Sequence, residues 1–269
     1  MNEQELLFER DGAVGVVTMN RPEKLNALSP GIIGGLMKLA ASMPDDQETR
    51  TLLLRGNGRA FCAGGDVSSF PTGDASKEQR EARAGVSRPV SETSPALALR
   101  NTSKLIVAAI HGYAVGGGLS IALACDIRIA SEDAKFGAVQ LRRGVLPDMG
   151  LTHLLARTVG TSKALELSVR AGDGELFGAA EALALGIVTH VVPREDLEDA
   201  SMEFAQKVAR GPSLALGFAK EGIYRAVESS LEEALQFEAP KIQACFASHD
   251  CDESKHAFLE KREPVFVGH

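Results

Sequence analysis

Short apolar runs alternate with amphipathic segments over residues 1–200 of the chain. The run at 105–110 (LIVAAI) is rich in β-branched residues and is typical of a buried strand. Ser29 and Pro30 form a start signal for a helix predicted at 30–43. Strands that alternate with helices in this way indicate an α/β fold. Comparable apolar runs predict further strands at 6–8, 14–19, 51–54, 127–130 and 187–192.

The pattern changes near residue 200. From there on only helical periodicity remains, at 197–210, 213–228, 231–247 and 254–262. We therefore expect two parts, a core at residues 1–200 and a helical part at residues 201–269. Residues 68–102 are polar, hold three prolines and carry the charge run KEQREAR, which is typical of a surface loop with some helix.

Two of the predicted strands lead into glycine-rich turns. Gly116, Gly117 and Gly118 stand between strand 105–110 and a helix predicted at about 119–124, and AGG at 63–65 follows the strand at 51–54. Glycines allow close approach to the backbone, and the first N–H groups of a helix have no partner within it. Two such turns can direct two N–H groups at one developing oxyanion. A purely structural turn is the alternative for each.

The composition of the chain argues against several classes of partner and site. The net charge of −7 argues against nucleic acid or an acidic membrane as a partner, and no apolar run is long enough to span a bilayer. The four cysteines have no metal-ligand spacing, so no metal site is expected. The acidic N-terminal segment has no apolar signal region. These features predict a cytoplasmic protein with reduced thiols.

Several motifs in the right order resemble the crotonase family, also called the enoyl-CoA hydratase/isomerase family. They are NRPEKLNALS at 20–29, AFCAGGD at 60–66, HGYAVGGG at 111–118, ACDIRIA at 124–130, KFG with GVLPDMG at 135–150, and AFLEKREPVF at 257–266. The resemblance implies a crotonase-like spiral of ββα units with a C-terminal helical domain. It also implies an acyl-CoA thioester substrate in fatty acid metabolism, no separate cofactor, and a homotrimer or a dimer of trimers.

The resemblance places the oxyanion donors at the backbone N–H groups of Gly65 and Gly117. It places Lys24 against a CoA phosphate, and it implies that Phe258 and Lys261 reach CoA from a neighbouring subunit. The full set of implied CoA contacts is Glu23, Lys24, Leu25, Ala27, Ala63, Gly64, Asp66, Val67, Phe258 and Lys261.

The sequence departs from the hydratases of the family at two positions. Those enzymes activate water with two glutamates, but here the positions hold Ser120 and Gln140. Neither side chain can act as a carboxylate base. Ser120 is a candidate for orienting the acyl group or a water and Gln140 for hydrogen-bonding the ligand, with a structural role as the alternative for both.

Asp148, in the LPDMG loop, is the carboxylate that remains where the family does its chemistry. This loop and the C-terminal segment look most like the 1,2-epoxyphenylacetyl-CoA isomerase group. We therefore predict an isomerase that shifts a double bond, with Asp148 as acid and base, its pKa raised by burial among Val145, Leu146 and Met149. A helix-capping role is the alternative for Asp148.

Two other readings of the whole protein stay open. One is a different reaction on the same fold, such as an atypical enoyl-CoA hydratase or an acyl-CoA hydrolase. The other is a non-catalytic acyl-CoA binder. Away from these residues, Asp126 and Arg128 fit a structural hydrogen-bonded pair in the core.

Overall fold

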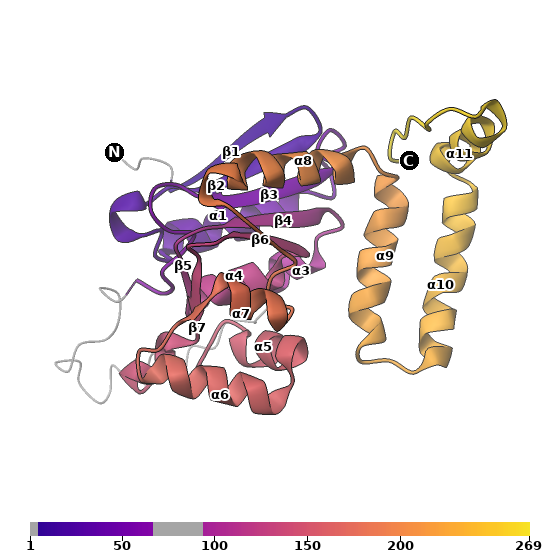
Figure 1. Ribbon diagram of the computed structural model, residues 1–269. Coiled ribbons are helices and arrows are strands. Elements are labelled where there is room, and N and C mark those ends of the chain that lie inside the picture. Colours follow the sequence, from indigo (N-terminus) through magenta and orange to yellow (C-terminus); the bar gives the residue numbers. More distant parts are fainter. Residues whose placement is uncertain (1–4, 67–93) are drawn as a thin grey trace.

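The computed structural model describes residues 5–66 and 94–269 (Figure 1). A six-stranded sheet forms the centre, in the order β1-β2-β3-β4-β6-β9. Only β1 and β2 pair in antiparallel fashion, and every other neighbouring pair in this sheet is parallel. Its strands are β1 (Leu6–Asp11), β2 (Val14–Met19), β3 (Thr51–Gly56), β4 (Leu105–Ile110), β6 (Ile127–Ser131) and β9 (His190–Val192).

A second, three-stranded sheet has the order β5-β7-β8. Its strands are β5 (Tyr113–Val115), β7 (Lys135–Gly137) and β8 (Phe177–Gly178). β5 follows β4 after a short turn and leads directly into α4 (Gly117–Ala124), so two strands and a helix form one unit of the expected spiral. The sequence did not predict β5. The short helix α7 (Ala179–Ala184) follows β8.

The remaining core helices surround these sheets. They are α1 (Pro30–Ser42), α3 (Pro95–Asn101), α5 (Leu151–Val159) and α6 (Thr161–Gly172), with 3-10 turns at Pro22–Lys24, Val139–Arg143 and Arg194–Asp196. The start signal of α1 is confirmed, since the Ser29 side chain accepts a hydrogen bond of 3.1 Å from the N–H of Ile32.

Alternation along the strands divides the core between two faces of the sheet. In β4, Ile106, Ala108 and Ile110 pack against the helices on one face. Val107 and Ala109 pack on the other face, which α8 (Leu197–Ala209) crosses in Figure 1. Because α8 belongs to this second core, we propose that the two parts of the chain divide after α8 rather than at residue 200.

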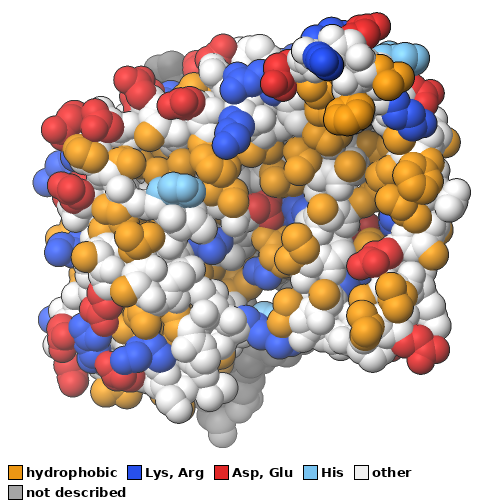
Figure 2. Space-filling model, turned by 45° about the vertical axis from the view of Figure 1, so that its right-hand side comes forward, with side chains coloured by type: hydrophobic (Ala, Val, Ile, Leu, Met, Phe, Trp, Pro, Cys, Tyr) orange, Lys and Arg blue, Asp and Glu red, His pale blue; other side chains and the backbone are white. Residues whose placement is uncertain are grey.

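The C-terminal part consists of α9 (Ser213–Ala226), α10 (Leu231–Phe246) and α11 (His249–Glu260). In Figure 1, α9 and α10 run side by side next to the body, and α11 lies beyond them. The helix predicted at 254–262 thus begins earlier, at His249. Figure 2 shows hydrophobic side chains facing solvent over this part of the molecule.

One buried polar cluster ties α9 to the sheet. Asp126 accepts hydrogen bonds from Lys220 Nζ at 2.9 Å, from the Ile106 N–H at 2.7 Å and from the Tyr224 hydroxyl. Burial beside Asp126 raises the pKa of Tyr224. Arg128 donates to two backbone carbonyls instead, so the predicted pairing of Arg128 with Asp126 is wrong.

Candidate active site

The two glycine turns lie side by side because their backbones pair. The Cys62 N–H donates to the Tyr113 carbonyl at 2.8 Å, and the Val115 N–H donates to the Cys62 carbonyl at 3.1 Å. A Cβ atom built on Gly117 would lie 3.8 Å from the Gly65 nitrogen. The structure thus brings the two predicted oxyanion donors together.

Glycine is required at the close approaches between these turns. Gly64 has a φ of +89°, and a Cβ on it would lie 2.8 Å from the Val115 carbonyl oxygen. A Cβ on Gly118 would lie 2.2 Å from the Cys62 carbonyl oxygen. Among the described residues no acceptor takes the N–H of Gly65 or Gly117, and α4 begins at Gly117. Both N–H groups are therefore available to a ligand oxygen, as the predicted oxyanion role needs.

These donors border a cavity of about 60 Å³. Its far wall is the segment 139–149, which contributes the polar side chains of Gln140, Arg143 and Asp148. Apolar side chains also line it, namely Val139, Val145 and Met149. The cavity therefore combines oxyanion donors, one carboxylate and an apolar lining.

Gln140 and Asp148 contact each other in this wall. Gln140 Nε2 donates a hydrogen bond of 3.3 Å to Asp148 Oδ1. Gln140 Oε1 is buried and has no partner among residues 5–66 and 94–269. We propose that Gln140 orients the carboxylate and offers its Oε1 as an acceptor to a ligand.

The expected apolar burial of Asp148 is not supplied by its neighbours along the chain. Asp148 is exposed, and Val145 and Leu146 are 40% and 70% exposed. The proposed capping role is also wrong. Gly150 is the N-cap of α5, and no side chain caps this helix. The Asp148 carboxylate accepts the hydrogen bond from Gln140 instead.

Ser120 has a different role from the one expected. It is fully buried, and its hydroxyl donates to the Met149 carbonyl rather than to its own helix. It does not line the cavity. We propose that Ser120 positions the Asp148–Met149 loop against α4 instead of touching the acyl group.

The two predicted CoA-binding segments also lie side by side. The Ala63 N–H donates to the Leu25 carbonyl at 3.0 Å, and the Leu28 N–H donates to the Gly64 carbonyl at 2.7 Å. The Asp66 N–H reaches the Leu28 carbonyl at 3.4 Å. This pairing makes one continuous strip that ends at the oxyanion donor Gly65.

The other predicted CoA contacts in these segments differ in how far they are exposed to solvent. Glu23 and Lys24 are exposed on the 3-10 turn before the strip, and Ala27 is buried within it. Val67 lies outside the described residues. The exposed lysine agrees with a role as a point charge for phosphate.

Sequence reasoning missed two residues that hold this strip. Asn26 is fully buried, accepts from the Arg21 N–H and donates to the Asn57 and Ala60 carbonyls. Arg21 donates to the Ala27 carbonyl and to Asp66. Asn26 has a φ of +55°, a conformation that asparagine tolerates. The sequence signal that could have identified this residue was an asparagine in the turn that follows Pro22.

Phe258 and Lys261 are not brought to the cavity within one chain. Phe258 is 83% exposed, and Lys261 ends α11. Figure 1 shows α11 well apart from α4.

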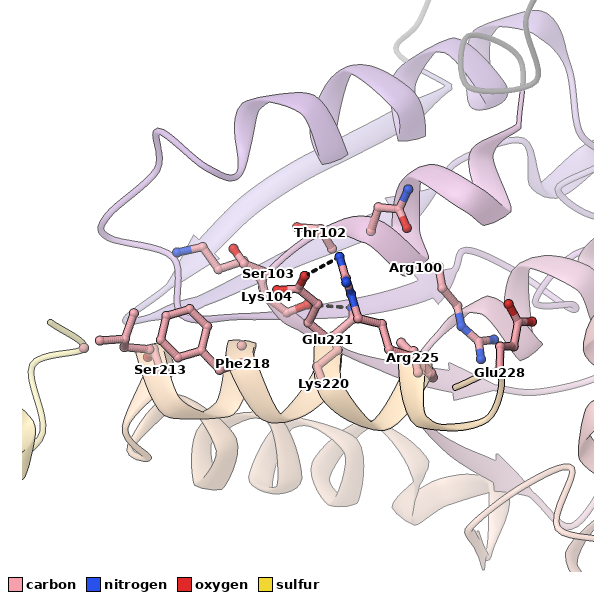
Figure 3. A pocket seen from close by; sticks show the side chains of 15 residues that line it. Arg100, Thr102, Ser103, Lys104, Ser213, Phe218, Lys220, Glu221, Arg225 and Glu228 are labelled. Atoms are coloured by element: carbon pink, nitrogen blue, oxygen red, sulfur yellow. Dashed lines mark hydrogen bonds and ion pairs between the residues drawn. The ribbon is translucent and has the colours of Figure 1, made fainter. Parts of the chain in front are cut away.

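A cavity of about 630 Å³ lies elsewhere. Thr102, Ser103 and Lys104 face α9 residues such as Phe218 and Glu221 across it (Figure 3). It contains neither glycine turn, so it lacks oxyanion donors. Within the described ranges we also find no cluster of metal-ligating side chains and no helix able to cross a membrane.

The whole chain is similar to proteins of known class. A family model described as enoyl-CoA hydratase/isomerase matches residues 9–269. A probable enoyl-CoA hydratase of Mycobacterium bovis is 35% identical over 267 residues, 99% of each chain. A short-chain-enoyl-CoA hydratase of Clostridium acetobutylicum is 32% identical over 264 residues, 98% of this chain and 97% of that one. The crystal structure of an enoyl-CoA hydratase from Bacillus anthracis is 31% identical, with a TM-score of 0.88, and covers 99% of this chain and 100% of its own.

The spiral and its paired glycine turns define a crotonase-fold protein, which confirms the predicted fold. The chain belongs to the enoyl-CoA hydratase/isomerase family. Enzymes of this family act on CoA thioesters, so the expected substrate class agrees with the family.

Proposed function

We propose that this enzyme shifts a double bond in an enoyl-CoA, in the manner of the 1,2-epoxyphenylacetyl-CoA isomerase group. The observation that carries the proposal is the cavity itself. Asp148 is the one carboxylate among the described residues that line it, and it lies in the same wall as Gln140 and opposite Gly65 and Gly117. A double-bond shift needs one base, whereas the family's hydration chemistry uses two carboxylates.

The steps balance with these groups alone. Asp148 takes a proton from C2 of a 3-enoyl-CoA, and the electron pair moves onto the thioester oxygen as a dienolate. The N–H groups of Gly65 and Gly117 stabilise this oxyanion. Asp148 then returns the proton to C4, and the double bond lies between C2 and C3. Gln140 keeps the carboxylate oriented through its hydrogen bond to Oδ1.

The remaining expectations follow the same proposal. CoA lies along the strip of 23–28 and 63–66, with Lys24 near a phosphate and no further cofactor. Phe258 and Lys261 reach the CoA of a neighbouring subunit, which is supported by their absence from the cavity lining of their own chain. A homotrimer or dimer of trimers provides that neighbour. The cytoplasmic location and the place in fatty acid metabolism stay predictions.

Hydration of a 2-enoyl-CoA is the second candidate. The relatives described above are named hydratases. The unpartnered Gln140 Oε1, next to Asp148, is also suited to accept a hydrogen bond from a water. In that case Asp148 activates the water and Gln140 replaces one of the two glutamates.

Absorbance of the conjugated thioester separates the candidates. One cuvette holds a 3-enoyl-CoA and a second holds a 2-enoyl-CoA of the same length. We expect absorbance to rise in the first and stay constant in the second. A fall in the second identifies a hydratase. No change in either contradicts both candidates and points to an unusual substrate or, with measurable CoA binding, to a non-catalytic binder.

A further inference from the structure

Arg143 is a charged residue of the cavity wall that the proposed reaction does not use. It is the last residue of the 3-10 turn Val139–Arg143. Gly144 then adopts a φ of +65°, and the Val145 N–H turns back to the Gln140 carbonyl at 3.2 Å. This reversal puts Arg143 and Val145 in the wall that also holds Asp148.

Arg143 is exposed, and its guanidinium has no partner among residues 5–66 and 94–269. Within the part of the chain that the structure describes, no hydrogen bond or ion pair involves its side chain, and none joins it to Asp148. By contrast, Arg21 and Arg170 each pair with a carboxylate. The neighbouring Arg142 points away from the cavity, since its guanidinium lies 3.1 Å from the position of a Cβ on Gly174.

Apolar side chains form part of the wall that the oxyanion donors share with this cation, beside Gln140 and Asp148. Val139, Val145 and Met149 line the cavity that Gly65, Gly117 and Arg143 share. Apolar side chains suit the methylene groups of an acyl chain. An unpaired arginine at the same wall suits a planar anion, because its fork of N–H groups matches a carboxylate in bidentate geometry.

We propose that Arg143 binds a carboxylate at the far end of the acyl chain, so the enzyme prefers ω-carboxyacyl-CoA thioesters. This inference rests on the proposed function in one respect, namely that the ligand is an acyl-CoA thioester. The preference concerns binding and is independent of whether the enzyme isomerises or hydrates.

The test measures binding of saturated thioesters, which cannot react at a double bond. Calorimetry compares succinyl-, glutaryl- and adipyl-CoA with butyryl-, valeryl- and hexanoyl-CoA. We expect one of the carboxylated thioesters to bind about 10–100-fold more tightly than its methyl-ended counterpart, as for a charge-assisted pair. Arg143→Met abolishes this preference and Arg143→Lys keeps part of it. Arg142→Met is the matched control and leaves it unchanged.

Equal affinity within every pair of thioesters overturns the proposal. So does an Arg143→Met variant that loses affinity for free CoA and for acyl-CoA by the same factor, because Arg143 then contacts a CoA phosphate. A preference that depends on Arg143, found in a protein that does not move a double bond, supports this inference while contradicting the isomerase. If Arg143→Met leaves isomerisation of carboxylated and methyl-ended substrates unchanged, the isomerase proposal stands and this inference is contradicted.

Discussion

At the scale of single residues, two neighbouring glycines separate activity from folding. The close contacts of a Cβ on Gly117 are with two flexible side chains, Leu28 at 2.8 Å and Met149 at 2.9 Å. We expect Gly117→Ala to fold but to lose about 100-fold in kcat, because the shifted Met149 and turn misplace an oxyanion donor. Steady-state kinetics and urea unfolding measure both effects.

Gly118→Ala is the control for this experiment. Its Cβ would lie 2.2 Å from the backbone oxygen of Cys62, which cannot move as a side chain end can. We expect this variant to lose about 3 kcal/mol of stability. A Gly117→Ala protein with normal kcat contradicts the assignment of the oxyanion donors.

His111 makes stability depend on pH. It is 5% exposed, its Nε2 lies 3.0 Å from the Gly58 carbonyl, and burial lowers its pKa from 6.5. Below pH 6.5 the unfolded chain binds a proton that the folded chain does not, so stability falls as pH falls toward the folded pKa. We expect His111→Asn to remove this slope, which is at most about 1.4 kcal/mol per pH unit. Urea unfolding at several pH values between 5 and 7.5 measures it.

The exposed His153 supplies the comparison for this experiment. His153→Asn should keep the slope of the unchanged protein. If His111→Asn keeps the slope of the unchanged protein, the prediction is contradicted and other groups cause the pH dependence of stability.

Sequence reasoning located the residues of the site better than their environments. Gly65, Gly117 and Asp148 share the cavity as predicted, because the motifs place each at the end of a strand or in a defined loop. The exposure of Asp148 was not predictable, since it depends on how the segment 139–149 folds back. The contacts of Ser120 and Asn26 depend on segments distant in sequence and were missed for the same reason.

At the scale of elements, the attachment of α9 to the sheet depends on a buried ion pair. The side chains of Lys220 and Asp126 are 4% and 9% exposed. Removing one partner leaves the other charge buried and unpaired, so we expect Lys220→Met to destabilise the protein by about 3 kcal/mol. Chemical unfolding of the two proteins gives the difference in free energy.

An exposed pair provides the reference. Lys163 and Glu166 on α6 are 37% and 50% exposed, and Lys163→Met should change stability by less than about 1 kcal/mol. Equal effects of the two substitutions would show that the buried pair does not hold α9 in place.

The strength of each periodic pattern decided which elements were predicted. β4 and α1 have long or well-delimited patterns and were predicted with nearly their observed bounds. β5 and β8 are three and two residues long, which is too short for a pattern to be recognised. The packing of α8 on the sheet is a tertiary contact that the sequence pattern does not contain, so our proposed boundary after α8 rests on the structure.

At the scale of the whole molecule, the C-terminal helices leave apolar side chains in solvent. Leu231 is 77% exposed, Leu235 55% and Ile223 66%. Such a surface is typical of a protein interface. We expect sedimentation to give a mass that is three or six times the chain mass of 28.5 kDa.

Introducing charge on this apolar surface by substitution tests whether it forms the interface of the oligomer. The double variant Leu231→Glu and Leu235→Glu should dissociate and should bind CoA more weakly, because Phe258 and Lys261 lose the neighbouring site. Glu232→Gln, which removes a charge on the same helix, serves as the control. A wild-type protein that sediments as a monomer would contradict the oligomer.

The role of Asp148 is the central claim, and the Asp148→Asn enzyme tests it most directly. Asparagine keeps the shape of the side chain and removes the base, and no helix cap is lost with it. We predict that isomerisation of a 3-enoyl-CoA falls at least about 100-fold while affinity for CoA is unchanged. Full isomerase activity in this variant would contradict the account.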